Sequence, residues 1–390
     1  MTTKAVNLQI PFHRADLGED EVDAVAQVIR SGWLTMGPKT FEFERRFADY
    51  IGASHAVAVS SCTAALHLAL EAVGVRRGDE VLVPTTTFTA TAEVVTYLGA
   101  RPVFVDIDAR ALNIDPADIE RKITRRTKAI IPVHFAGMPC DMTEILEIAA
   151  QHKLHVIEDA AHALPAAYKG KRIGTISELT AFSFYATKTL TTGEGGMITT
   201  ESEEHARRLQ VMRLHGIARD AWKRYSAEGS WFYEVLETGF KYNLTDLQAA
   251  LGVVQLAKCD GMNRARERVA ERYTSAFQTI EAIEVTAALP DRNTSWHLYV
   301  LRLRLDRLRI DRNKFIQELA DRGVSTSVHF IPLHLQPVYQ RDYQYKLGDF
   351  PVAEQEYERS LSLPIYPTMR DEEVEHVIWA VSDTVSNWSQ

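Results

Sequence analysis

The sequence predicts an α/β protein with a largely parallel β-sheet and a smaller α+β unit after it. Short β-branched runs alternate with helical patterns between about residues 55 and 200. These runs are apolar almost throughout, which is typical of strands buried on both faces. At 390 residues, the chain is also too long for one simple core. Ligands of such folds bind at the carboxyl ends of the strands.

The first 40 residues predict an N-terminal arm and a leading helix. Val22, Val25, Ala26 and Ile29 recur at helical spacing within residues 19–29. Ser31 and Gly32 then end the pattern.

Strand and helix patterns alternate after this helix. The expected strands are 55–60, 80–84, 101–107, 128–133, 155–159, 179–185 and 196–200. The expected helices cover 63–73, a segment through Ala92 and Val95, 142–151 and 201–213.

Residues 216–240 have weak periodicity and several aromatic side chains, so we expect a functional loop or hairpin there. A long helix is expected from about residue 245. Strand-like 297–305, a helix at 311–322 and the segment 324–333 complete a C-terminal α+β unit. We therefore expect an arm and large domain over 1–245 and a small domain over 246–390.

Composition excludes several classes of protein. The net charge of -8 argues against broad nucleic-acid binding, which needs a basic surface. Cys62, Cys140 and Cys259 form neither a disulfide framework nor a metal pattern, so no metal site is expected. No signal peptide is evident, and no stretch approaches the roughly 20 apolar residues of a spanning helix. These features predict a soluble cytoplasmic protein with reduced thiols and no membrane partner.

Lys188 is a candidate nucleophile because it follows an aromatic strand, where a ligand crevice is expected. A lysine amine becomes nucleophilic near neutral pH when burial or nearby charge lowers its pKa. Gly193, Gly195 and Gly196 follow it and allow close backbone approach. Taken alone, the stretch fits an ordinary loop lysine equally well.

Asp159 lies at the carboxyl end of a predicted buried strand, 29 residues before Lys188 (188 − 159 = 29). A carboxylate there can keep a pyridine nitrogen protonated. Alternation along the strand points Glu158 to the opposite face. A helix N-cap is the alternative role for Asp159.

Two further strand ends carry groups suited to a flat, phosphorylated ligand. The segment SSCTAAL at 60–66 joins a strand to a helix whose N-terminus can bind phosphate, although simple capping by Ser61 or Thr63 also fits. Phe88 can stack on a ring or pack in the core. The fingerprints of dinucleotide and P-loop sites are missing from the sequence.

In combination, these features resemble the DegT/DnrJ/EryC1/StrS family of sugar aminotransferases. The resemblance runs almost end to end, from LGEDEVDAVAQVIRSGWLTMGPKTFEFERRFADYIG to LSLPIYPTM. Its most diagnostic stretches are VSSCTAALHLAL, VPTTTFTATAEVV, VIEDAAHALPAAYKGKRIG, FSFYATKTLTTGEGGMITT, GFKYNLTDLQAALG and HFIPLH. The resemblance implies fold type I, as in aspartate aminotransferase, and the cofactor pyridoxal 5'-phosphate (PLP).

The resemblance also implies a role for each matching residue. Lys188 is expected to form the internal aldimine, Asp159 to pair with the pyridine nitrogen and His162 to lie near the ring hydroxyl. The expected phosphate ligands are the amides of Thr63 and Ala64 and the hydroxyl of Ser183. Phe88 is expected over the ring, although many relatives carry Trp or Tyr there.

Other implied contacts come from more distant segments. Asn243 is expected to reach the phosphate of a neighbouring subunit, which implies a homodimer with shared active sites; a turn before a helix capped by Thr245 also fits. His329 is expected at the substrate pocket, and His134 is a weaker candidate. Lys223, Arg224 and Lys241 are candidates for the substrate diphosphate or for a solvated loop.

The implied reaction transfers an amino group from L-glutamate to the 4-keto group of a nucleotide-linked ketosugar, with pyridoxamine 5'-phosphate (PMP) as the intermediate form. The stretch from His215 to Asp246 most resembles the UDP-4-ketosugar branch, including the 4-amino-arabinose enzymes, which suggests lipopolysaccharide or related glycan biosynthesis. A sugar 3-aminotransferase, a dehydratase or a non-catalytic regulator are alternatives. Lys188 argues against the dehydratases, which carry His at that position.

Overall fold

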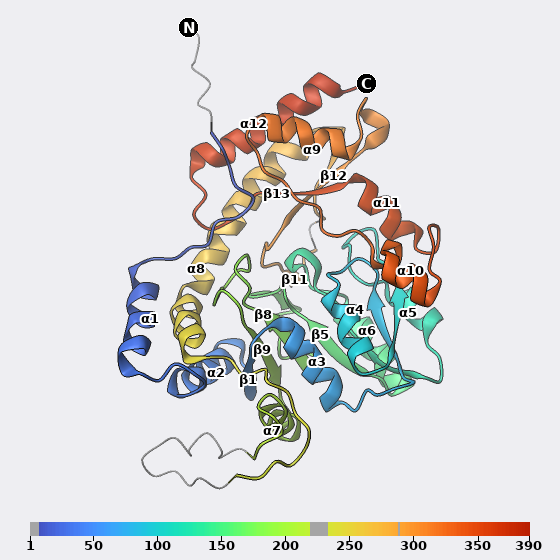
Figure 1. The fold of residues 1–390 in the computed structure, drawn as a ribbon. Coiled ribbons are helices and arrows are strands. Elements are labelled where there is room, and N and C mark those ends of the chain that lie inside the picture. Colours follow the sequence, from blue (N-terminus) through green and yellow to red (C-terminus); the bar gives the residue numbers. More distant parts are fainter. Residues whose placement is uncertain (1–7, 219–232, 288) are drawn as a thin grey trace.

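The computed structural model describes residues 8–218, 233–287 and 289–390 (Figure 1). Its central sheet has the order β1-β9-β8-β5-β4-β2-β3. The strands are β1 His55–Val59, β2 Glu80–Pro84, β3 Arg101–Val105, β4 Thr127–Ile130, β5 His155–Asp159, β8 Leu179–Ser183 and β9 Gly196–Thr200. β9 runs antiparallel to both neighbours, whereas the other pairs are parallel, so the predicted largely parallel sheet is confirmed.

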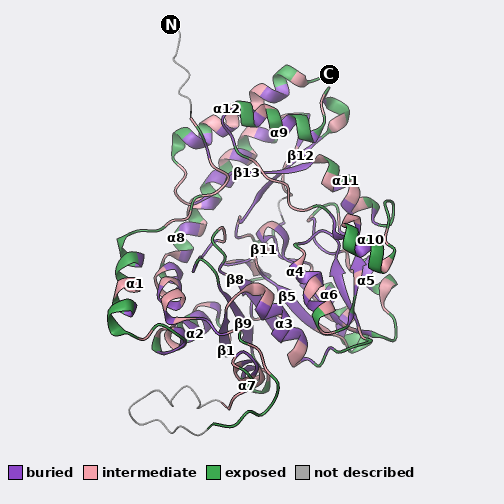
Figure 2. Ribbon diagram, viewed as in Figure 1, coloured by how far each residue is buried: buried purple, intermediate pink, exposed green. Residues whose placement is uncertain are grey.

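Helices cover both faces of this sheet, and its strands are therefore largely buried (Figure 2). In β1, Val57 and Val59 join one apolar cluster, while Ala56 and Ala58 join the other. The first cluster includes side chains of α3 Cys62–Ala72, α4 Ala90–Tyr97 and α7 Glu203–Met212. The second includes side chains of α2 Pro38–Ile51, α5 Pro116–Lys122, α6 Met142–His152 and the start of α8 Asp246–Phe277. Burial on both faces explains the continuous apolar runs of the sequence.

The leading helix is α1 Glu19–Ser31, and Gly32 ends it in the left-handed conformation at φ 75°. Its apolar stripe is not the side that the chain buries. Glu21 and Val28 are buried, whereas Val22 and Ile29 are each 59% exposed. Glu21 accepts hydrogen bonds from Gln255 and Lys258 of α8. The side of α1 that packs against the rest of this chain therefore carries Glu21 and Val28, while Val22 and Ile29 of the apolar stripe face outward.

A third apolar cluster forms the C-terminal unit. It includes residues of β12 Tyr299–Leu303, β13 Ser360–Leu363, α9 Arg312–Asp321, α12 Asp371–Trp388 and the later part of α8. Thr245 caps α8 by accepting a hydrogen bond from the Gln248 amide at 3.3 Å. Because α8 contributes to two clusters, the division at residue 245 stays a prediction.

The N-terminal arm crosses to this C-terminal unit. Ile10 forms a parallel bridge with Val324, and the Ile10 amide donates to the carbonyl of Gly323 at 2.8 Å. The beginning of the described chain therefore lies beside its last third (Figure 1).

Several elements differ from the prediction. The segment 324–333 contains isolated bridges at Val324 and Ser327 but no regular strand. Residues 219–232 of the expected loop lie outside the described part of the chain. The structure also contains elements that were not predicted, namely α2, α5, β13, α12 and the smaller elements α10 Pro337–Tyr343, α11 Pro351–Arg359, β6 Ala167–Tyr168, β7 Lys171–Arg172, β10 Ile283–Glu284 and β11 Arg292–Asn293. Within the described ranges, no helix is both long enough and apolar enough to cross a membrane.

Candidate active site

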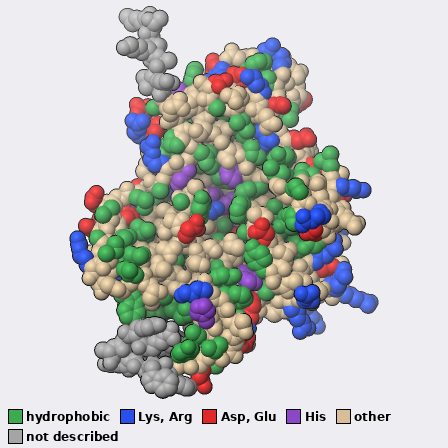
Figure 3. All heavy atoms as spheres, in the orientation of Figure 1, with side chains coloured by type: hydrophobic (Ala, Val, Ile, Leu, Met, Phe, Trp, Pro, Cys, Tyr) green, Lys and Arg blue, Asp and Glu red, His purple; other side chains and the backbone are tan. Residues whose placement is uncertain are grey.

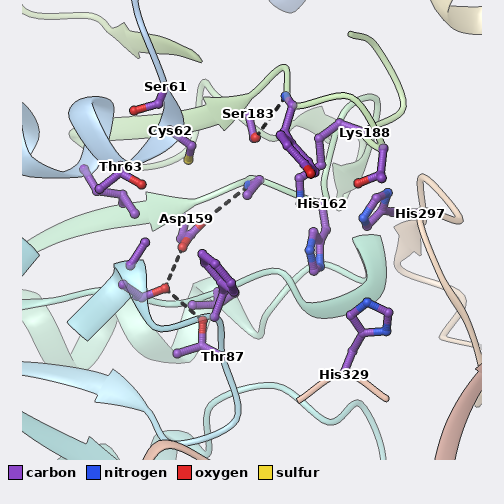
Figure 4. Close-up of a pocket in the computed structure, with 18 of the residues that line it drawn as sticks. Ser61, Cys62, Thr63, Thr87, Asp159, His162, Ser183, Lys188, His297 and His329 are labelled. Atoms are coloured by element: carbon purple, nitrogen blue, oxygen red, sulfur yellow. Dashed lines mark hydrogen bonds between the residues drawn. The ribbon is translucent and has the colours of Figure 1, made fainter. Parts of the chain in front are cut away.

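A cavity of about 480 Å³ opens where β5 and β8 end and α3 begins (Figure 4). This is the carboxyl edge of the parallel strands, as the sheet topology predicts. Figure 3 shows histidine side chains gathered around a recess on this face. The cavity brings together predicted residues from distant parts of the chain, namely Thr63, Phe88, Asp159, His162, Ser183, Lys188 and His329.

Lys188 lies in the turn that follows β8, where its amide donates to the carbonyl of Tyr185 at 2.9 Å. Burial lowers the pKa of its amine from 10.5 to about 8, against the opposing influence of Cys62 and Asp159. A much larger share of this amine than of an ordinary lysine is therefore uncharged near neutral pH, and the uncharged amine is the form that attacks a carbonyl.

Asp159 ends β5 with its carboxylate held from two sides. Its Oδ1 accepts the Ala161 amide at 3.1 Å, and its Oδ2 accepts the Thr91 hydroxyl at 2.9 Å. Burial raises the pKa of this carboxyl, whereas both hydrogen bonds and Lys188 oppose that rise. No helix follows it directly, so the N-cap alternative does not apply.

The neighbouring Glu158 points to the other face, as strand alternation predicts. It is fully buried and accepts hydrogen bonds from His134 at 2.8 Å, Ser177 at 2.7 Å and Thr180 at 3.0 Å. Burial opposes its charge, but these donors together hold its pKa below the usual range. His134 Nδ1 accepts the Cys140 amide, so Nε2 carries the proton given to Glu158. His134 therefore has a structural role and does not line the cavity.

The start of α3 forms the polar end of the cavity. The Ser61 hydroxyl accepts the Ala64 amide at 3.1 Å, so the capping that the sequence allowed is present. Thr63 and Ser183 line the same region. A Cβ on Gly196 would lie 2.5 Å from the Ser61 carbonyl, so glycine permits β9 to approach this helix start.

Two of the predicted histidines line the cavity in the neutral state. Burial holds the pKa of His162 well below 6.5, and its Nδ1 accepts the Ala136 amide at 3.3 Å. Nε2 of His162 must therefore carry the proton and act as a donor. Burial also lowers the pKa of His329 to about 4, with Lys188 adding to the effect. His329 Nδ1 lies 2.9 Å from the Ser362 hydroxyl, and Phe12 of the arm stacks on its ring at 5.6 Å.

The cavity also contains polar residues that the sequence did not predict, among them Thr87, Thr91 and His297. The His297 ring lies 4.3 Å from that of His162. Thr91 belongs to the stretch VPTTTFTATAEVV, which carries part of the family resemblance. A single threonine in a helix does not by itself indicate a role in a binding site.

Other predicted residues do not line the cavity of their own chain. Lys241 Nζ donates to the Asn243 side chain, and the Asn243 backbone pairs with Val59 of β1. Lys223 and Arg224 lie outside the described residues.

Comparison with known proteins agrees with this geometry. A family model described as the DegT/DnrJ/EryC1/StrS aminotransferase family matches residues 15–382. The uncharacterized protein MJ1066 of Methanocaldococcus jannaschii is 53% identical over 377 residues, covering 97% of this chain and 98% of its own. The spore coat polysaccharide biosynthesis protein SpsC of Bacillus subtilis is 50% identical, covering 96% and 97%. The putative sugar aminotransferase Spr1654 from Streptococcus pneumoniae, solved in PMP and PLP forms, has a TM-score of 0.91 and 35% identity, covering 97% of this chain and 98% and 99% of those chains.

Proposed function

This chain belongs to the DegT/DnrJ/EryC1/StrS aminotransferase family and is a PLP-dependent sugar aminotransferase of fold type I, and from that premise we propose its substrates. The proposed reaction moves the amino group of L-glutamate to the 4-keto group of a nucleotide-diphosphate ketosugar, with UDP as the nucleotide. The product would enter amino-sugar and cell-surface glycan biosynthesis. The name of SpsC, a polysaccharide biosynthesis protein, supports that setting.

The observation that supports the proposal is one cavity whose groups fit the cofactor that this reaction needs (Figure 4). A helix start with Ser61 and Thr63, suited to phosphate, lies at one end, and Ser183 lines the same region. The buried carboxylate of Asp159 and the amine of Lys188, whose pKa is lowered to about 8, follow. These residues therefore fit PLP, with Phe88, 60% exposed, available to cover the ring.

When bound, PLP supplies a carbonyl that condenses with amines and a ring that accepts electrons. The Lys188 amine would be the nucleophile that holds the cofactor, and as a free amine it would be the base that takes the donor's α-proton. Asp159 holds a proton at the pyridine nitrogen. The Nε2–H of His162 would be free to donate to the ring oxygen, because Nδ1 accepts the Ala136 amide.

The absorption spectrum of the purified protein tests the first half of this proposal. We expect a yellow band that bleaches with L-glutamate and regains its intensity with the correct ketosugar. UDP-linked 4-keto and 3-keto sugars should be compared with their dTDP counterparts. Bleaching that no UDP-4-ketosugar reverses, while another ketosugar does, would overturn the substrate assignment and leave the family untouched.

The same proposal includes a homodimer with shared sites. Val22 and Ile29 of α1 are exposed in the single chain, and Asn243 does not line the cavity of its own chain. Both features are expected if a second copy covers α1 and receives Asn243. Mixing Lys188→Ala and Asn243→Ala subunits should then restore one intact site per mixed dimer. Persistent inactivity of the mixture, with subunit exchange shown by differently tagged copies, would contradict sharing.

A further inference from the structure

A chain of buried hydroxyl groups leads to Asp159 (Figure 4). The Thr91 hydroxyl donates to Asp159 Oδ2 at 2.9 Å, and the Thr87 hydroxyl lies 2.8 Å from that of Thr91. Thr87 and Thr91 are each 1% exposed. Because a threonine has one proton to give and Thr91 gives it to Asp159, Thr87 must donate to Thr91.

We infer that Thr91 is a positioning residue for Asp159, and that Thr87 anchors Thr91 in turn. This inference rests on the proposed function, in which Asp159 holds the proton of the pyridine nitrogen. Each carboxylate oxygen accepts one bond from the protein, from Ala161 or from Thr91, and keeps lone-pair capacity for a ligand. The pair of threonines therefore fixes the carboxylate without saturating it.

The position of Thr87 adds a second consequence. Thr87 directly precedes Phe88, and Thr91 lies one turn later in α4. The loop that carries the ring-covering residue is thereby tied to the group that meets the ring nitrogen. Loss of the Thr87 hydroxyl should disturb both the face and the edge of the bound cofactor.

The Thr91 hydroxyl also affects the charge of Asp159. A donor to the ionised carboxylate favours that form, so its removal should raise the pKa of Asp159 further. The other titratable groups around this carboxylate are Cys62, His134, Cys140 and Lys188, and none of them is changed by a substitution at Thr91.

The test compares Thr91→Val, which keeps the shape and removes the hydroxyl, with Thr91→Ser, which keeps the hydroxyl. The readout is the rate of the half-reaction of the PLP-loaded enzyme with L-glutamate, measured against pH. Hydrogen bonds to charged groups shift equilibria roughly 10-fold to 100-fold. We expect Thr91→Val to lose about that factor at the plateau and to move the acid limb up by about one pH unit. Thr91→Ser should restore both.

Two further variants complete the design. Thr87→Val should move the acid limb in the same direction by a smaller amount, and it serves if Thr91→Val does not fold. Thr96→Val is the matched control on the same helix, because its hydroxyl donates to the carbonyl of Glu93. It should behave as the wild type. A lowered plateau with an unmoved limb, or equal effects of Thr91→Ser and Thr91→Val, would overturn the inference.

A second readout needs neither cofactor nor activity. In the cofactor-free protein, the infrared carbonyl band of protonated Asp159, identified by its loss in Asp159→Asn, should persist to higher pH in Thr91→Val than in the wild type. An unchanged titration would refute the role of Thr91. A wild type that fails to react with L-glutamate would refute the proposed donor, while this titration would still decide the inference.

Discussion

Glu158 and Asp159 are adjacent acidic residues of one strand, yet their carboxylates lie in opposite environments. Glu158 faces away from the cavity, and its carboxylate accepts hydrogen bonds from His134, Ser177 and Thr180. Asp159 faces the cavity with one protein donor on each oxygen. The pKa of Glu158 is held low and that of Asp159 is raised. A saturated carboxylate supports the fold, whereas an unsaturated one is available to a ligand.

The largest effect on the reaction should come from a substitution in the cavity, at Lys188. Lys188→Ala removes both the nucleophile and the base, so we expect the half-reaction with L-glutamate to fall on the order of 10^4-fold. Stopped-flow absorbance would measure it. Burial lowers the pKa of this amine because its charged form is unfavourable in the folded protein. Removing the amine should therefore not lower the thermal midpoint of the cofactor-free variant. A large fall would mean that Lys188 belongs with the structural groups.

Asp159→Asn tests the comparison of Glu158 with Asp159 by removing the charge that faces the cavity. We expect a loss of about 10^2-fold to 10^3-fold in the half-reaction, because an amide holds the pyridine nitrogen's proton poorly. The cofactor-free protein should be as stable as the wild type or more so, since a buried charge is removed. Parallel urea unfolding and single-turnover kinetics would separate the two effects.

Glu158→Gln should show the reverse pattern. The donors of Ser177, Thr180 and His134 would lose a charged acceptor, which costs about 1–3 kcal/mol of the free energy of unfolding. The absorbance change with L-glutamate should keep its amplitude and rate. Equal stability with impaired chemistry would break the distinction between the two residues.

The smallest effect concerns the pH dependence of stability. The pKa of Glu158 lies below its usual 4.5, so its stabilisation is present above pH 4.5 and is lost as the pH falls further. The pKa of Asp159 lies above its usual 3.8, so its ionisation costs stability as the pH rises beyond 3.8. We therefore expect acid unfolding curves of Glu158→Gln and Asp159→Asn, without cofactor, to diverge from the wild type in opposite directions by about 1 kcal/mol.

The sequence predicts that Glu158 and Asp159 point to opposite faces of the sheet, because side chains alternate strictly along a strand. Lys188 and Asp159 were also predictable, since strand ends of a parallel sheet share one edge. Thr91 and His297 were not, because their roles depend on contacts with residues far along the chain, such as Asp159 and His162.

Helical spacing likewise predicted α1 but not which side of it would be buried. The stripe of Val22 and Ile29 suggested a core-facing side, yet the chain buries Glu21 through ion pairing with Lys258. A periodic pattern shows that an apolar side exists and does not show which surface will cover it. The segment 324–333 follows an irregular path, and its consecutive residues His329 and Phe330 both line the cavity.

The path of the N-terminal arm has a practical consequence for anyone preparing this enzyme. Ile10 is bound to the last third of the chain, and Phe12 stacks on His329 in the wall of the cavity. A version trimmed to residue 17 for crystallisation would retain every strand of the central sheet and yet lose the ring that packs on His329. Purification tags are therefore better attached at the other terminus, and we expect proteolytic clipping near residue 12 to lower activity while the central sheet stays in place.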